Sequence, residues 1–217
     1  MNVDLEGPAG RLEALFEESP RAAFAALVCH PHPRFGGTMH NHATYRLAKA
    51  VRAKGGDVLR FNYRGVGRSA GTYGSGHGEV EDAAAALAWL ARERPGVALL
   101  SCGFSFGAWM AILAGGAHPR VSGLVVAGLA LRGPDLERFR DSGRVREVER
   151  PLAIVQAERD EFGTPDEVRA ALVGSRGPRR LVAVPGATHL FLEHLPALQR
   201  EAEGAIGWVL GGAREPG

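Results

Sequence analysis

Cysteine is scarce in this chain of 217 residues. The two cysteines, Cys29 and Cys102, each stand at the end of an apolar segment. A disulfide framework is therefore excluded as the main source of stability, because such scaffolds are dense in cysteine. We interpret both residues as buried free thiols, since free cysteine is among the most buried residue types.

The sequence also lacks an excess of one charge and any long apolar run. Its 26 basic and 24 acidic residues give a net charge of +2 and are spread along the chain, so no dense basic patch indicates a nucleic-acid partner. No apolar run reaches about 18 residues, and no basic leader precedes an apolar stretch at the N-terminus. We therefore expect a cytoplasmic protein without a nucleic-acid or membrane partner. The oligomeric state stays open between a monomer and a homodimer.

The chain does have enough apolar sequence to bury a sizeable core. With 45% hydrophobic and 23% charged residues, it predicts one globular domain over residues 1–217. Short apolar runs alternate with helix-length segments, which is typical of parallel β-α-β units. Most of the runs lack polar alternation, as strands covered on both faces do. We expect strands at residues 24–29, 57–62, 97–102, 121–129, 152–157 and 180–185.

Helical spacing fills the segments between these strands. We expect helices at residues 41–55, 78–96, 105–116, 165–177 and 196–212. Residues 2–18 form two short alternating stretches around Gly7, Pro8 and Gly10, which predict an antiparallel hairpin at the sheet edge. The predicted fold class is α/β, with a mostly parallel, doubly wound sheet that carries this hairpin.

One polar residue stands between two glycines where a predicted strand meets a predicted helix. Gly103-Phe104-Ser105-Phe106-Gly107 is a G-x-S-x-G sequence in that position. A sharp corner there lifts the serine hydroxyl out of the sheet, and the helix N-terminus behind it favours negative charge on a substrate. The alternative is a tight turn whose serine only caps the helix. We interpret Ser105 as a nucleophile.

A serine nucleophile needs a base, and the base needs an acid that orients it. Asp160 follows the predicted strand at 152–157, and His189 lies in the loop after the next strand. Because parallel strands end at one edge of a sheet, these side chains can meet. The alternatives are His194 as the base and, as the acid, Glu158, Glu161 or Asp166.

The chain order Ser105, Asp160, His189 is that of the α/β-hydrolase superfamily, which the sequence resembles over essentially its whole length. The stretch CHPHPRFGGTMHNH at residues 29–42 is similar to the HPHP…GGTM loop of small bacterial α/β-hydrolases that have no cap domain. The stretch NYRGVGRSAGTYG at residues 62–74 resembles the superfamily's R-G-x-G-x-S loop, which we interpret as structural.

The resemblance implies an oxyanion hole built from two backbone N–H groups. One comes from the residue after the nucleophile, here Phe106, and the other from the loop at residues 29–42. We favour His32 as the second donor because its neighbours Pro31 and Pro33 have no N–H, with Arg34 as the alternative.

The same loop carries histidines that also fit a metal site. Paired H-x-H spacings occur in metallohydrolases. Yet no carboxylate lies among them, and proline follows the first two, so we predict neither a metal nor another cofactor. The four residues are His30, His32, His40 and His42.

The segment at residues 132–150 is too short for the helical cap of larger family members, and it predicts a single short helix. The site should then be open. The candidate substrate-binding walls are apolar and near the motifs, although Trp109 and Phe191 also fit an ordinary core: Phe35, Phe106, Trp109 and Phe191.

The combined prediction is a serine hydrolase that cleaves small, short-chain carboxylic esters through an acyl-enzyme. A thioesterase, an amidase or peptidase and an acyltransferase would use the same three side chains. A binding module with a disused site is the alternative of a different class, because a fold does not fix a function.

Overall fold

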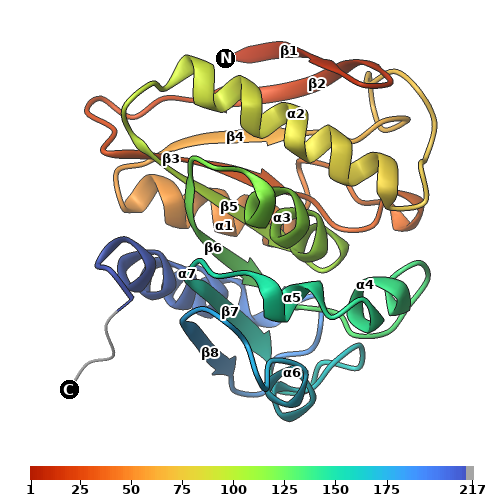
Figure 1. Ribbon diagram of the computed structural model, residues 1–217, viewed down its shortest axis with the longest axis vertical. Coiled ribbons are helices and arrows are strands. Elements are labelled where there is room, and N and C mark those ends of the chain that lie inside the picture. Colours follow the sequence, from red (N-terminus) through yellow and green to blue (C-terminus); the bar gives the residue numbers. More distant parts are fainter. Residues whose placement is uncertain (214–217) are drawn as a thin grey trace.

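The computed structural model describes residues 1–213, which form one eight-stranded mixed sheet with helices on both faces (Figure 1). The strands are β1 (Asn2–Gly7), β2 (Gly10–Glu17), β3 (Phe24–Cys29), β4 (Asp57–Phe61), β5 (Ala98–Phe104), β6 (Val121–Ala127), β7 (Leu152–Ala157) and β8 (Arg179–Val184). Their order in the sheet is β1-β2-β4-β3-β5-β6-β7-β8. The pairs β1–β2 and β2–β4 are antiparallel, and the other neighbours are parallel.

Four long helices cover the sheet. On one face α2 (His77–Glu93) packs beside α3 (Phe106–Ala117), and on the other α1 (His42–Ala53) packs beside α7 (Leu195–Leu210), as Figure 1 shows. Each pair closes an apolar cluster against the sheet. The shorter helices are α4 (Glu137–Asp141), α5 (Arg144–Glu147) and α6 (Pro165–Ala171). The prediction of a doubly wound α/β sheet with an N-terminal antiparallel hairpin is confirmed.

The direction of winding reverses beside β3. The chain leaves β3 through α1 to β4, and then returns through α2 to β5 on the other side of β3. The carboxyl ends of β3 and β5 are therefore neighbours at the point where the connections diverge. In open α/β sheets this point is a crevice in which ligands bind.

Both cysteines are free and buried, as predicted. Cys29 ends β3, and Cys102 lies on the neighbouring strand β5. Burial raises the pKa of each thiol to about 12, because a thiolate would lose its hydration there. They are packing residues at neutral pH.

The other predicted elements are present with bounds shifted by up to three residues, and two segments differ more from the sequence prediction. Residues 132–150 form two short helices, α4 and α5, instead of one, because Gly143 takes a left-handed conformation (φ +67°) between them. The helix expected at 165–177 ends at Ala171, and a turn follows in which the Ser175 hydroxyl donates to the Leu172 carbonyl. The expected single domain also includes residues 214–217, which lie outside the described part.

Among the helices of residues 1–213, none is both long enough and apolar enough to span a membrane.

Two glycine substitutions should move stability in opposite directions. A β-carbon on Gly103 at the end of β5 would overlap the backbone of Gly107, so Gly103→Ala should lower the free energy of unfolding by roughly 1–3 kcal/mol or more. The matched change Gly204→Ala lies in α7 with open space around it, and should raise stability by about 0.5–1 kcal/mol. Urea unfolding measures both. A Gly103→Ala protein as stable as the parent would show that the turn after β5 relaxes freely.

Candidate active site

The turn between β5 and α3 holds Ser105 in a strained backbone conformation. Its φ is +58° and its ψ −120°, a region that non-glycine residues seldom enter. The turn is fixed by its surroundings: the Ser105 N–H donates to Ala127 on β6 at 3.0 Å, and the Ala108 N–H donates to the Ser105 carbonyl at 2.9 Å. A β-carbon on Gly107 would overlap the backbone at Cys29 and His30, so the second glycine of the motif lets α3 begin against the end of β3.

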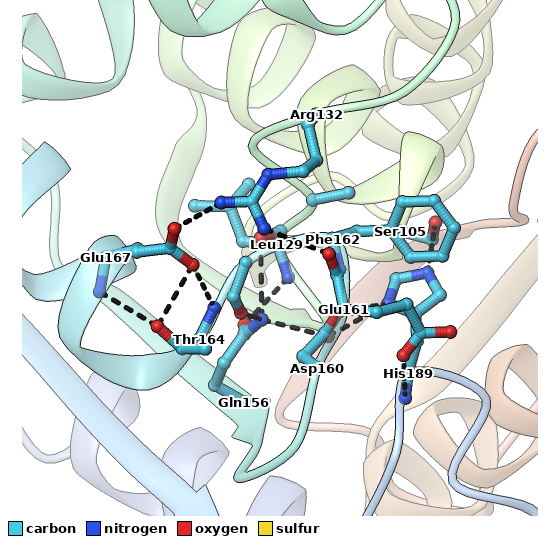
Figure 2. Close-up of polar contacts among 12 residues, drawn as sticks. Ser105, Leu129, Arg132, Gln156, Asp160, Glu161, Phe162, Thr164, Glu167 and His189 are labelled. Atoms are coloured by element: carbon cyan, nitrogen blue, oxygen red, sulfur yellow. Dashed lines mark hydrogen bonds and ion pairs between the residues drawn. The ribbon is translucent and has the colours of Figure 1, made fainter.

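The structure brings Ser105, Asp160 and His189 together in one chain of hydrogen bonds (Figure 2). His189 Nε2 lies 2.8 Å from the Ser105 hydroxyl, and Nδ1 lies 2.9 Å from both oxygens of Asp160. Because a carboxylate accepts hydrogen bonds, Nδ1 carries the proton and donates to it. Nε2 is then free to accept the serine proton. Ser105 directly follows β5, and Asp160 and His189 lie in the loops after β7 and β8, as their positions in the sequence predicted.

A buried glutamine orients the acid. Gln156, the one side chain on β7 with an amide, donates from Nε2 to Asp160 Oδ2 at 3.0 Å and to the Gly163 carbonyl at 2.7 Å. Its Oε1 accepts the Leu129 N–H at 2.9 Å (Figure 2). The Phe162 N–H donates to the other oxygen of Asp160 at 2.9 Å. Sequence reasoning missed Gln156, although a polar residue in the buried strand LAIVQA was a usable signal.

The other candidate acids have different partners. The Glu158 carboxylate accepts the Gly186 N–H at 2.7 Å, and the Glu161 carboxylate accepts the backbone N–H of His189 at 3.4 Å. Asp166 pairs with Arg169 at the surface. The alternative base, His194, stands at the start of α7. The geometry therefore favours Asp160 and His189 over these alternatives.

Aromatic packing holds the His189 ring in place. The ring stacks on Phe104 at a centroid distance of 5.3 Å and meets Phe162 at 4.7 Å. The residue is 4% exposed, so water has little access to the face of the imidazole. A ring held on two sides keeps its two hydrogen bonds aligned without a conformational search.

The expected oxyanion donors, His32 and Phe106, lie on adjacent elements beside Ser105. Phe106 is the first residue of α3, so its N–H has no acceptor within the helix. His32 caps the 3₁₀ turn Pro33–Phe35, and its carbonyl accepts the N–H groups of Phe35 and Gly37, both at 3.1 Å. Both residues border the same pocket as Ser105.

His30 and Asn62 hold the loop at residues 29–42 against its neighbour at residues 62–74. The Tyr63 N–H donates to His30 Nε2 at 3.3 Å, so the proton is on Nδ1, which donates to the Pro31 carbonyl at 2.7 Å. Burial lowers the pKa of His30 to about 3, so the ring is neutral. Asn62 Oδ1 accepts the Met39 N–H at 2.8 Å. These contacts support the structural interpretation of residues 62–74.

The histidine-rich loop does not assemble a metal site in the described structure. Across residues 1–213, no three histidine, cysteine, aspartate or glutamate side chains gather around a common point. Both ring nitrogens of His30 and of His32 are engaged in hydrogen bonds, whereas His40 and His42 are exposed.

An apolar pocket of about 420 Å³ opens above Ser105. Phe35, which is 69% exposed at the rim, and Phe106 border it as predicted. The prediction was wrong for Trp109 and Phe191, which are fully buried and do not line the pocket. Trp109 instead donates from Nε1 to the Ala130 carbonyl at 2.7 Å behind the pocket wall, and Phe191 packs beneath Phe104. Wall residues that the sequence did not suggest are Phe104, Leu136, Phe162 and Leu190.

The pocket rim also carries a cation, Arg132. Its guanidinium donates to the Glu161 carbonyl at 2.9 Å and pairs with the Glu167 carboxylate, so that it turns away from Ser105 (Figure 2). The positive charge is thereby compensated at the rim, and the cavity beside Ser105 stays apolar.

The substitution Asp160→Asn tests whether Asp160 orients the His189 imidazole, because it leaves His189 itself in place. In Asp160→Asn an amide can donate to Nδ1, which favours the wrong imidazole tautomer, so turnover should fall about 10⁴-fold with the fold intact. The control is Glu158→Gln, at a carboxylate that contacts Gly186, which should change turnover little. Steady-state kinetics with a chromogenic acyl substrate compares them, and a larger loss in the control variant would mean that the acid is misassigned.

Comparisons with known proteins agree with this geometry. The family model described as serine aminopeptidase, S33, matches residues 25–142. The chain is 46% identical over 113 residues to the uncharacterized protein RP471 of Rickettsia prowazekii. This match spans about half of each protein, 51% of this chain and 47% of the relative. An esterase of Pyrococcus furiosus, Pf2001, shares the fold at 19% identity with a TM-score of 0.78, the match covering 98% of this chain and 90% of that one.

Two solved structures are similar over nearly the whole chain. An α/β serine hydrolase homologue from Coxiella burnetii is 30% identical with a TM-score of 0.84, and the match covers 94% of this chain and 96% of that one. XC6422 from Xanthomonas campestris, a serine hydrolase without a lid, is 31% identical with a TM-score of 0.82, at 95% and 93% coverage. These two relatives, the family model and the Ser105–His189–Asp160 hydrogen bonds after the G-x-S-x-G turn agree with one another. The chain belongs to the α/β serine hydrolase superfamily, among its small members that lack a lid.

Proposed function

We propose that this protein hydrolyses short-chain carboxylic esters through an acyl-enzyme on Ser105. The observation that carries the proposal is the complete hydrogen-bond chain from the Ser105 hydroxyl through His189 to Asp160 at the floor of an apolar pocket. Such a chain activates a hydroxyl that is otherwise a weak nucleophile.

The first half of the reaction acylates the serine. His189 Nε2 removes the hydroxyl proton while Ser105 Oγ attacks the ester carbonyl, and Asp160 stabilises the imidazolium that forms. The backbone N–H groups of His32 and Phe106 receive the negative oxygen of the tetrahedral intermediate. His189 then gives its proton to the departing alcohol. In the second half, water attacks the acyl-enzyme by the same route and releases the acid.

The pocket supports a neutral, apolar ester as the substrate. Its walls are aromatic and aliphatic, and the cation on its rim is paired with Glu167. Pf2001, which is described as an esterase, shares this fold, and at 19% identity the likeness concerns the fold alone. A thioesterase, an amidase or peptidase and an acyltransferase would use the same steps and differ in the leaving group or the acceptor.

The absence of a lid supports a short acyl chain. Without a roof, each added methylene remains partly hydrated and contributes less than the roughly 0.8 kcal/mol of full burial. We therefore expect kcat/KM for p-nitrophenyl esters to be highest from acetate to butyrate and to fall by hexanoate or octanoate, without activation at a lipid surface. The ester series measures this directly. A maximum at decanoate or beyond would indicate an enclosed acyl tunnel and a long-chain substrate.

The nucleophile can be tested separately from the substrate. Ser105→Ala should retain the fold and lose about 10⁶-fold in kcat, the loss seen when the nucleophile of such a triad is removed. A fluorophosphonate probe should label the parent protein and leave Ser105→Ala unlabelled. A folded parent protein that the probe does not label would contradict the proposal and favour a binding module with a disused site.

A further inference from the structure

A second chain of hydrogen bonds connects the loop of His32 to the segment between β6 and α4. The Arg34 N–H donates to His32 Nδ1 at 3.2 Å, His32 Nε2 lies 3.1 Å from the Tyr73 hydroxyl, and that hydroxyl donates to Asp135 Oδ2 at 2.7 Å. The three side chains come from three different loops around the pocket. None of them belongs to the Ser105–His189–Asp160 chain.

The directions of these bonds fix the tautomer of His32. Since Nδ1 accepts the Arg34 N–H, the proton of the neutral ring is on Nε2, which donates to the Tyr73 oxygen. Burial lowers the pKa of His32, which keeps the ring neutral. Burial and the adjacent Asp135 raise the pKa of Tyr73, so its hydroxyl stays protonated and donates to the carboxylate. Each donor in the hydrogen-bond chain therefore points toward Asp135, and the chain ends on the negative charge of its carboxylate.

Three aromatic side chains pack around the His32 ring. Its centroid lies 4.7 Å from that of Phe106, 4.8 Å from that of Phe35 and 5.3 Å from that of Tyr73, and the residue is 7% exposed. The ring is therefore contacted on three sides and at both nitrogens.

Asp135, which accepts the Tyr73 hydroxyl, has an unusual backbone conformation. Its φ is +65°, in the left-handed region, and its second carboxylate oxygen lies 3.4 Å from a guanidinium nitrogen of Arg138 on α4. Strained residues persist where the surrounding structure determines them, and they cluster at functional sites. Because the Tyr73 hydroxyl donates to Asp135, its proton is committed there and is not directed at an oxyanion.

We propose that Tyr73 and Asp135 are positioning residues of the oxyanion hole, which act through the His32 ring to hold the His32 backbone N–H toward the reacting carbonyl. This inference rests on the proposed function, in which that N–H is an oxyanion donor. A donor stabilises developing charge only if it is already oriented when the charge forms. The residues after His32 include two glycines in succession, Gly36 and Gly37, so contacts of the His32 side chain add a restraint to the two backbone hydrogen bonds that the His32 carbonyl accepts.

The test uses Tyr73→Phe, which removes the hydroxyl and keeps the ring, and Asp135→Gly, which removes the carboxylate and suits the positive φ. Each should lower kcat for p-nitrophenyl acetate by about tenfold, less than the 10²–10³-fold seen when a donor itself is lost, with KM within about twofold. Asp135→Asn keeps an acceptor oxygen and tolerates the left-handed region, so it should recover most of the activity. The double variant should lose no more kcat than the worse single variant, because either substitution alone already breaks the hydrogen-bond chain from His32 to Asp135.

Inhibition by a boronic acid distinguishes a misplaced oxyanion donor from general damage to the active site. Butylboronic acid forms a bond from Ser105 Oγ to boron as His189 takes the hydroxyl proton, and the resulting anionic, tetrahedral boronate resembles the intermediate. If the donor is misplaced, the inhibition constant should rise by the same factor by which kcat/KM falls. Matched controls at exposed positions, Tyr45→Phe on α1 and Asp141→Gly on α4, should leave kcat and the inhibition constant unchanged.

Three results would overturn the proposal: unchanged kcat in Tyr73→Phe, a loss confined to KM with an unchanged inhibition constant, or single losses that multiply in the double variant. Failure of the proposed ester hydrolysis remains distinguishable. A parent protein that reacts with a fluorophosphonate but turns over no ester contradicts the substrate class, and the labelling rates of the variants relative to the parent still measure positioning.

Discussion

A β-carbon on Gly107 would overlap the backbone at the end of β3, and one on Gly103 would overlap Gly107. These two glycines let the first turn of α3 approach β3 more closely than any side chain would permit. The approach has two consequences for the site. It forces Ser105 through a corner with φ +58°, and it places the N–H of Phe106 beside the loop of His32. The other parts of the site are arranged around this contact.

Buried polar side chains then fix the loops that surround the corner. Gln156 joins β7 to Asp160 and to the segment after β6, His30 joins its own loop to Tyr63, and Asn62 holds Met39. Each group is hydrogen-bonded, so the cost of burial is offset and a partner in the wrong place would leave a donor or acceptor unsatisfied. Such networks favour one loop arrangement over many with similar apolar contacts.

The sequence allowed the sheet and the three residues Ser105, Asp160 and His189 to be placed, because uniformly apolar runs mark buried parallel strands and such strands end at a common edge. The sequence did not show which apolar residues line the pocket and which are buried in the core. Trp109 lies four residues after Ser105 on α3, and its apolar character indicates burial without telling which face of the helix meets the pocket. Contacts such as Tyr73 with Asp135, 62 residues apart, depend on how loops fold over the sheet. Local spacing carries no signal for them.

A hydrolase without a lid has to be organised before its substrate arrives. In enzymes that close over a ligand, closure expels water and completes the catalytic arrangement. Here the segment after β6 forms one wall of the pocket through Ala130 and Leu136. His189 makes its hydrogen bonds at 2.8 and 2.9 Å within the protein, and the His32 ring contacts the Tyr73 hydroxyl. Preorganised dipoles need no rearrangement when charge develops on the substrate, and this allows an open pocket to stabilise an oxyanion.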